Sequence, residues 1–207
     1  MRLFRPFVLA RLIYPRAIFR IPAGGKVLYI SFDDGPQDGS TESILGVLKS
    51  YNIKALFFCT GAAAWNRPDL AAMIREGGHV LGNHGYNHLN GFKTSLTGYI
   101  EDVKAADRLT SSKIFRPPYG KMTPAQYGAL RYDYHIFLWD VMPYDFDTSF
   151  PASRSLTILK KYIRPGSIIV FHDSPGSAVH SYLEKFIQYC FSLGYRFDIP
   201  AHLNQNS

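Results

Sequence analysis

Cysteine and long apolar runs are scarce in this sequence of 207 residues. Only two cysteines occur, Cys59 and Cys190, which are far apart and each lie inside an apolar stretch. This arrangement favours buried free thiols over a disulfide framework. No apolar run approaches the ~20 residues that a membrane-spanning helix needs, so we expect no transmembrane helix.

Acidic residues are absent from the first twenty positions, which carry five arginines: Arg2, Arg5, Arg11, Arg16 and Arg20. The formal net charge is +7, so the rest of the chain carries only 7 − 5 = +2. Because this body is nearly neutral, nucleic acid is not an expected partner. We interpret residues 1–25 as a basic arm packed on or near the domain. It is either solvated or in peripheral contact with an anionic membrane surface.

The arm does not have the pattern of an export signal. Arg11 interrupts the apolar run from Phe7 to Ala10, and Pro15 follows before any small-residue cleavage site. The sequence therefore favours a cytoplasmic or peripheral membrane-associated protein. Hydrophobic residues make up 46% of the chain and charged residues 19%, which excludes a disordered protein. At this length we expect one domain over residues 26–207, acting as a monomer.

Short apolar runs alternate with segments of helical periodicity along the whole chain. The expected strands cover residues 27–32, 55–59, 79–81, 114–115, 134–139, 167–171 and 195–199. The expected helices start at Thr41, Pro68, Leu96, Thr123, Leu156 and Tyr182. About seven such units predict parallel strands with right-handed crossovers, in either a wound open sheet or a closed barrel.

Ionisable residues cluster directly after the predicted strands or at their ends, where parallel α/β folds place their sites. They are Asp33 and Asp34, His84 and His88, Arg116, Asp145, and His172. Taken alone, the run Asp33 to Pro36 is also compatible with an ordinary turn. Likewise, two histidines at this spacing are also compatible with surface or core positions.

Two adjacent carboxylates repel each other unless a positive group lies beside them, and a bound cation would supply that charge. His84 and His88 are four residues apart, so on one helical turn both imidazoles would point the same way. With Asp34 they make a ligand set suited to Zn²⁺ that leaves positions open for water and substrate. The other histidines are expected to be structural or solvent-facing: His79, His135, His180 and His202.

Five segments resemble, in order, the motifs of the polysaccharide deacetylases, also called NodB-homology or carbohydrate esterase family four enzymes. They read SFDDGP (Ser31–Pro36), HGYNH (His84–His88), RPPYG (Arg116–Gly120), WDVMPYDF (Trp139–Phe146) and IIVFHD (Ile168–Asp173). Each is weak alone, but five in sequence are specific. The resemblance runs from about Lys26 to the C-terminus and implies a distorted, incomplete (β/α) barrel of about seven strands.

The resemblance also implies a role for each matching residue. Asp33 would be the general base, oriented by Arg116, and His172 the general acid, paired with Asp145. The metal, Zn²⁺ with Co²⁺ as an alternative, would be held by Asp34, His84 and His88. The backbone N–H of Tyr119 would stabilise an oxyanion, and Trp139, Ile169 and Val170 would line the acetyl pocket. Asp173 receives no role.

The implied activity is removal of N-acetyl groups from an N-acetylglucosamine-containing polysaccharide or oligosaccharide of the peptidoglycan or chitin type. Phe146 stands where many members have Trp, so an aromatic wall is kept without an indole N–H. The short loop after Tyr119 predicts a shallow, open groove. The alternatives are an O-acetyl sugar esterase and a catalytically silent sugar-binding relative; the full set of Asp33, Arg116, Asp145 and His172 argues against the silent one.

Overall fold

The computed structural model describes residues 4–6, 8–200 and 203, without the side chains of residues 8 and 9. Arg2, Phe7 and His202 lie outside the described residues. The strands are β1 Val27–Asp33, β2 Leu56–Cys59, β3 Val80–Asn83, β4 Ile114–Phe115, β5 His135–Ile136, β6 Ile168–His172 and β7 Arg196–Phe197. The helices are α1 Val8–Ile13, α2 Ser40–Ser50, α3 Gly61–Asn66, α4 Pro68–Glu76, α5 Leu96–Thr110, α6 Pro124–Leu130, α7 Ala152–Tyr162 and α8 Leu183–Ser192.

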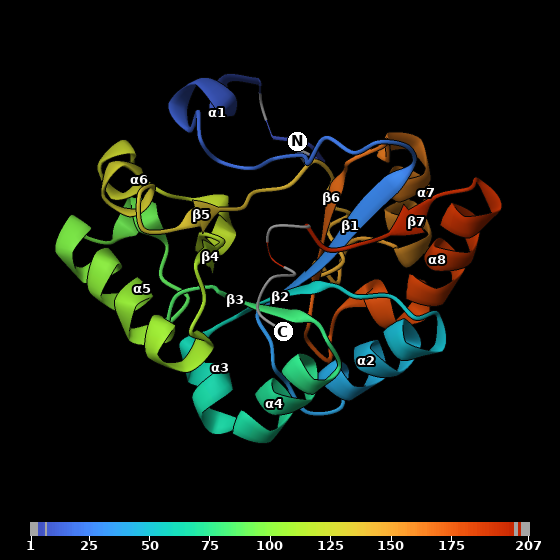
Figure 1. The fold of residues 1–207 in the computed structure, drawn as a ribbon, viewed down its shortest axis with the longest axis horizontal. Coiled ribbons are helices and arrows are strands. Elements are labelled where there is room, and N and C mark those ends of the chain that lie inside the picture. The colour runs from blue at the N-terminus through green and yellow to red at the C-terminus, as the bar shows by residue number, and fades with distance from the viewer. Residues whose placement is uncertain (1–3, 7, 201–202, 204–207) are drawn as a thin grey trace.

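The strands form one sheet in the order β5-β4-β3-β2-β1-β6, with β7 paired to β1, and every pairing is parallel. The sheet curls, and helices α2 to α8 flank it in an arc from α6 and α5 past α3, α4 and α2 to α8 and α7 (Figure 1). This curled half-barrel confirms the predicted incomplete (β/α) barrel in a single domain.

The alternation of side chains along β1 separates the helix-facing core from the barrel interior. Leu28, Ile30 and Phe32 pack in the largest core cluster, together with buried residues of α2 and α8. Tyr29 belongs to a second cluster inside the curl. Asp33 lies on the same face as Tyr29, at the carboxyl end of the strand. The strand register therefore directs the Asp33 carboxylate toward the mouth of the barrel.

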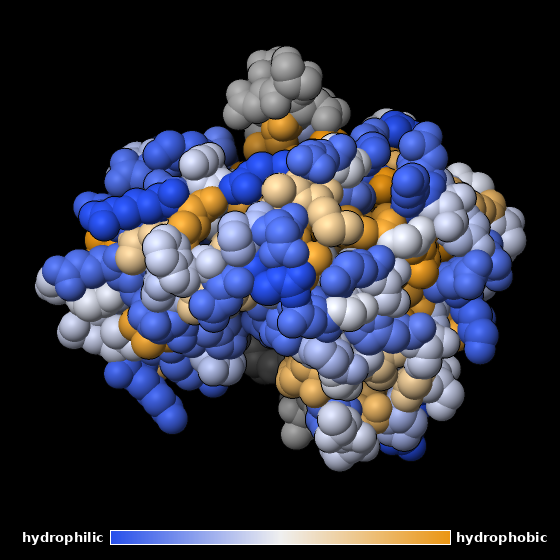
Figure 2. All heavy atoms as spheres, turned by 90° about the horizontal axis from the view of Figure 1, so that it is seen from below, coloured by the Kyte–Doolittle hydropathy of each residue, from blue (hydrophilic) through white to orange (hydrophobic). Residues whose placement is uncertain are grey.

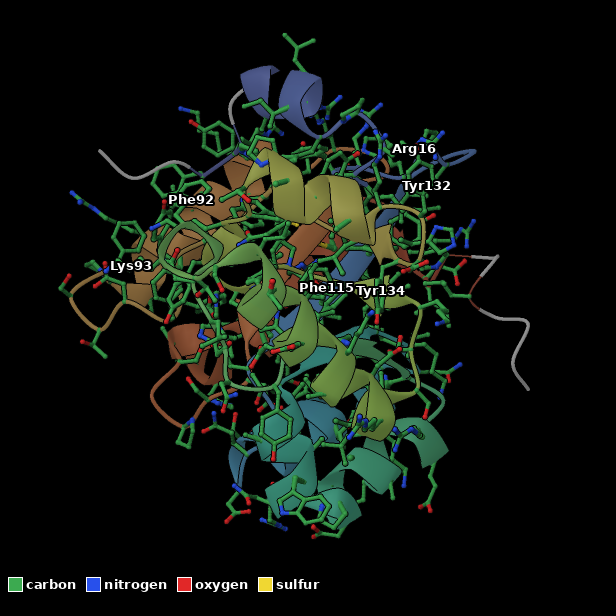
Figure 3. The ribbon with its side chains drawn as sticks, turned by 90° about the vertical axis from the view of Figure 1, so that its left-hand side faces the viewer. Arg16, Phe92, Lys93, Phe115, Tyr132 and Tyr134 are labelled. Carbon is green, nitrogen blue, oxygen red and sulfur yellow. The ribbon has the colours of Figure 1, made fainter. Side chains whose placement is uncertain are left out.

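The gap between β5 and β6 is closed by isolated bridges, two of which come from the N-terminal arm. The bridges join Ile18 to Phe137, Arg20 to Ser167, and Val141 to Ile169. Tyr14 and Phe19 of the arm are buried in a core cluster with residues of α5 and α6. Arg16 stacks on the Tyr132 ring at 4.9 Å (Figure 3). Residues 14–20 are thus a packed part of the barrel wall.

The polar outer faces of the helices are visible from the end where α2, α3 and α4 lie. This surface is predominantly hydrophilic, with small, separate hydrophobic areas (Figure 2).

Cys59 and Cys190 are buried free thiols, as the sequence predicted. Among the described residues, no helix has both the length and the apolar character to span a membrane.

Several element boundaries differ from the sequence prediction. Helix α3 was not predicted, because its Gly-Ala-Ala-Ala-Trp-Asn sequence has no apolar periodicity. It forms because the Thr60 side chain accepts a hydrogen bond from the Ala63 N–H. Strand β5 stops at Ile136 rather than continuing to residue 139, because Leu138 donates to Ile18 of the arm instead of pairing within the sheet. Helix α7 begins at Ala152, directly after Pro151, and not at Leu156.

Candidate active site

A cavity of about 330 Å³ lies at the carboxyl ends of the strands. This is near the lower end of the ~300–1,000 Å³ typical of ligand pockets. It is lined by Asp33, Asp34, His84, His88, Tyr119, Gly120, Lys121, Trp139, Met142, Tyr144, Phe146, Val170 and His172. Residues from five motifs that are far apart in the sequence therefore share one hollow.

Asp34, His84 and His88 bring three metal-ligating atoms together, all within 4.8 Å of one another. Asp34 Oδ1 lies 3.5 Å from His84 Nε2 and 3.1 Å from His88 Nε2. The two imidazole rings are 5.1 Å apart between centroids. One carboxylate oxygen and two imidazole nitrogens at this separation suit a tetrahedral Zn²⁺ site with an open position.

The protonation states of these side chains also fit a metal site. Burial opposes ionisation of Asp34, but the interaction with His88 and the neighbouring His84 and His172 side chains prevail and lower its pKa. Burial lowers the pKa of His84, which keeps that ring neutral. His84 Nδ1 lies 2.7 Å from the Arg116 carbonyl, so its N–H points there and Nε2 faces Asp34. Asp34 Oδ1 is buried without a hydrogen bond of regular geometry from any described residue.

The segment from His84 to His88 is a turn, and the expected helical turn is wrong. Gly85 has φ 73° and His88 has φ 56°, which no right-handed helix contains. The Asp102 carboxylate of α5 accepts hydrogen bonds from the Tyr86 and Asn87 N–H groups at 2.8 and 3.0 Å. A Cβ on Gly85 would lie 2.7 Å from Asp102 Oδ2. The close fit of this helix against the turn, and not helical spacing, brings the two histidines together.

Asp33 is held by a buried ion pair with Arg116. Arg116 Nη1 donates to Asp33 Oδ1 at 2.6 Å and to Ser31 Oγ at 2.8 Å. The guanidinium carbon lies 4.0 Å from the centroid of the Phe58 ring. Asp33 Oδ2 is on the side of His84, 3.9 Å from its Nε2. One oxygen of Asp33 is thus fixed by arginine while the other lies beside the candidate metal site.

His172 forms a second acid–base pair with Asp145. His172 Nδ1 lies 3.0 Å from Asp145 Oδ1, and the His172 backbone N–H donates to Asp145 Oδ2 at 2.7 Å. Burial would lower the pKa of His172, but the charge and hydrogen bond of Asp145 outweigh it and raise this pKa to about 9. Because Nδ1 of His172 is used by Asp145, the proton that a protonated His172 can donate to a ligand is the one on Nε2.

The side chains predicted to contact the substrate, apart from Tyr119, divide into two groups. Trp139, Phe146 and Val170 line the cavity, and the Phe146 ring lies 4.6 Å from the His172 ring. Ile169 does not line it: this residue is fully buried in the helix-facing core cluster, because strand alternation sends it to the opposite face from Val170.

Tyr119 lies at the rim with φ 58°, and its ring is 4.5 Å from that of His88. Tyr119 and three other lining residues, Asp34, His88 and Tyr144, account for four of the six non-glycine residues with positive φ in the described chain. Such conformations concentrate at functional sites.

Four further lining residues were not identified from the sequence: Gly120, Lys121, Met142 and Tyr144. The weak sequence signal was their position inside or directly after two of the quoted motifs.

Asp173, which had no assigned role, accepts hydrogen bonds from Ser40 Oγ at 2.6 Å and Thr41 Oγ1 at 2.7 Å. Its carboxylate leaves no room for a Cβ on Gly35, so Asp173 packs beneath the loop that carries Asp34.

The remaining described histidines lie away from the cavity. His79 is buried, and its Nδ1 accepts a hydrogen bond from the Ala55 N–H at 3.2 Å. Burial lowers the pKa of His79 to about 4, so this ring is neutral in the folded protein. His135 and His180 are exposed.

Comparison with known proteins bears on the identity of this site. The family described as "Polysaccharide deacetylase" matches residues 20–134. A peptidoglycan-N-acetylglucosamine deacetylase of Bacillus cereus is 33% identical over 91% of this chain and 72% of its own length. The solved Bc1960 peptidoglycan N-acetylglucosamine deacetylase shares 31% identity, with a TM-score of 0.80 over 91% of this chain and 92% of its own.

A third similar structure is a mutant of BA3943, described as a carbohydrate esterase family 4 pseudoenzyme with restored enzymatic activity. Its TM-score is 0.81 at 23% identity, over 91% of this chain and 71% of its own, and it shares the fold. The match over more than half of this chain and the identity to the first two relatives confirm the resemblance seen in the five motifs. The chain belongs to the polysaccharide deacetylase family, the carbohydrate esterase family 4 enzymes that hydrolyse the N-acetyl amide bonds of polysaccharides.

Proposed function

We propose that this protein is a metal-dependent hydrolase that removes N-acetyl groups from N-acetylglucosamine units of a polysaccharide or oligosaccharide of the peptidoglycan or chitin type. The observation that carries the proposal is the convergence of Asp34, His84 and His88 beside both Asp33 and His172 in one cavity. The peptidoglycan-N-acetylglucosamine deacetylases among the relatives support the choice of sugar.

Asp34, His84 and His88 would hold Zn²⁺ or Co²⁺. When bound, such an ion polarises an amide carbonyl and acidifies water, both of which amide hydrolysis requires. Asp33 takes the proton of the attacking water with the oxygen that Arg116 leaves free. The ion pair with the buried Arg116 keeps Asp33 oriented for that task.

His172 donates a proton to the leaving amine, which is too basic to depart without one. Asp145 keeps His172 protonated, since it raises the pKa of His172 to about 9. The base and the acid are therefore separate residues held by separate partners: Arg116 holds Asp33, and Asp145 holds His172.

The remaining cavity residues position the acetyl group. Trp139 and Val170 form apolar walls for its methyl group, and the backbone N–H of Tyr119 stabilises the developing oxyanion. Phe146, half exposed at 45%, offers an aromatic face beside His172 on which a sugar ring can rest.

Acetate release from chitotetraose and from purified peptidoglycan, with Zn²⁺ or Co²⁺ added, tests this function. We expect release that disappears when the metal is removed and returns when it is restored. O-acetylated xylan is the comparison substrate, and exclusive activity on it would assign the site to an esterase instead. A folded, metal-loaded protein that releases no acetate from any of these would be a silent sugar-binding relative.

A further inference from the structure

The catalytic cavity opens into a second, larger hollow, which we name the arm groove. Its volume is about 870 Å³, more than twice that of the cavity. The two share six lining residues: Tyr119, Gly120, Lys121, Trp139, Met142 and Tyr144. The far wall is supplied by the N-terminal arm, including Pro6, Ala10 and Ile13. The two hollows therefore adjoin, and one ligand can occupy both.

The walls of the arm groove are mainly hydrocarbon. Leu138 forms part of the lining along with the arm residues, and the Tyr14 hydroxyl is already used in a hydrogen bond to the Met122 carbonyl. Ile13 and Phe92 line the groove yet remain 46% and 62% exposed. Phe92 lies at one edge of the molecule, next to Lys93 and apart from Arg16 and Tyr132 (Figure 3). Exposed apolar side chains gathered at a groove mark a binding surface.

Positive charge lies at the junction and along the arm. Lys121 lines both hollows, and its side chain forms no hydrogen bond or ion pair with any other residue in the described part of the chain. Arg5 at the groove lies 3.7 Å from Asp140, but Arg164 already holds this carboxylate at 2.5 Å. Two guanidinium groups sharing one carboxylate leave a net positive charge, which attracts an anionic ligand.

We propose that the substrate is a lipid-linked sugar: the N-acetylated sugar lies in the catalytic cavity, a phosphate lies at Lys121, and a hydrocarbon chain lies in the arm groove. The inference rests on the proposed function for its sugar part and on the arm groove for its lipid part. A hydrocarbon chain needs no hydrogen-bonding partners, whereas the hydroxyl groups of a glycan in this groove would lose those that water provides.

Calorimetric titration with decyl phosphate, below its critical micelle concentration, tests the lipid part without any turnover. The groove variant carries Ile13→Asn and Phe92→Asn. The control carries Leu12→Asn and Trp65→Asn, which are 76% and 67% exposed and line neither hollow. We expect the groove variant to bind decyl phosphate about tenfold more weakly, which corresponds to ~1.4 kcal/mol, and the control to bind like the parent. Equal binding by all three proteins would overturn the inference.

The phosphate position has its own pair of variants. Lys121→Ala should weaken decyl phosphate but not decanol, whereas Lys93→Ala, at an exposed lysine that lines neither hollow, should change neither. The Lys121 effect should shrink at high salt, because exposed charges are screened. A Lys121→Ala protein that keeps the parent affinity for decyl phosphate contradicts the placement of the phosphate.

Kinetics test the connection between the two hollows. The substrates are N-acetylglucosamine joined through a phosphodiester to a decyl chain, and chitotetraose. The groove variant should raise KM about tenfold for the first substrate and leave it unchanged for chitotetraose. An equal rise for both would make the groove a glycan subsite and overturn the inference. Acetate release from neither substrate would overturn the proposed function, while groove-dependent decyl phosphate binding would still support the lipid site.

Discussion

Asp33 and Asp34 are adjacent in the sequence, yet their carboxylates have different partners. Asp33 contacts Arg116, whereas Asp34 contacts the two histidines. The positive φ of 77° at Asp34 turns the chain between them. The repulsion expected for two neighbouring carboxylates is thus relieved on one side by a guanidinium and, in our proposal, on the other by a metal ion. This separation lets one carboxylate act as a base while the other binds the metal.

Replacing Asp33 separates these two tasks. We expect Asp33→Asn to lower kcat by about 10²–10⁴, the usual contribution of a general base, with zinc content unchanged. Asp38→Asn, at an exposed carboxylate on the same loop, is the matched control and should keep parent activity. Acetate release and metal analysis measure the two effects. Full activity in Asp33→Asn would show that another group activates the water.

Asp145 sets the pH range over which His172 is an acid. In the parent, a pKa of about 9 keeps His172 protonated at neutral pH, and its acid function is lost as the pH rises through that value. Asp145→Asn removes the charge that raises this pKa, so the alkaline limb of kcat/KM should move to lower pH. The pH–rate profile measures the shift. An unchanged alkaline limb would mean that His172 is not the acid.

The turn from His84 to His88 shows how neighbouring elements build the site. Sequence spacing alone suggested a helical turn, but the turn is held by Asp102 of α5, which is distant in sequence. Such a support cannot be recognised in one sequence, because a polar residue in a helix is usually just solvated. The lining residues Lys121, Met142 and Tyr144 could not be recognised from one sequence either.

Asp102→Ala should loosen this turn without removing any ligand. We expect zinc affinity to fall about 10–100-fold, the usual cost of removing a residue that orients a metal ligand. Glu101→Ala changes the neighbouring exposed carboxylate and should leave the affinity unchanged. Competition with a zinc chelator measures both variants. Parent affinity in Asp102→Ala would show that the turn keeps its conformation without this carboxylate.

Strands with strong local signals were predicted well, and weak ones were not. The apolar run at residues 27–32 and its polar end located β1 and the Asp33 carboxylate, because a buried strand is nearly continuous in hydrophobicity. The prediction of Ile169 as an acetyl-pocket residue was wrong, because side chains alternate along β6 and Ile169 faces the helices while Val170 faces the cavity. Strand β5 was predicted too long, because its pairing is lost to the arm, a contact that no local pattern reveals.

At the scale of the whole molecule, the arm bridges the gap in the incomplete barrel. Periodicity could not distinguish an open sheet from a barrel, since closure depends on bridges between distant segments such as Ile18 with Phe137. The basic character of the arm predicted a segment packed on or near the domain, either solvated or facing a membrane, but did not predict these bridges. In the structure Phe19 is 5% exposed and packs in the core, although its neighbours in sequence are arginine-rich.

Phe19→Ala tests whether the arm unfolds together with the barrel. We expect the free energy of unfolding to fall by about 3–5 kcal/mol, the usual cost of truncating a buried phenylalanine. Leu12→Ala, at a residue 76% exposed in the same arm, should change it by less than about 0.5 kcal/mol. Denaturant unfolding followed by circular dichroism gives both values. A Phe19→Ala protein as stable as the parent would show that the arm detaches at little cost.

The central claim is that Asp34, His84 and His88 together hold one divalent cation. Calorimetric titration of the metal-free protein with Zn²⁺ tests it most directly, with His84→Ala as the variant and His180→Ala, at an exposed histidine outside the cavity, as the control. We predict one bound Zn²⁺ per chain for the parent and the control, and loss of binding in His84→Ala. Binding of Zn²⁺ by His84→Ala with the parent's affinity would contradict the account.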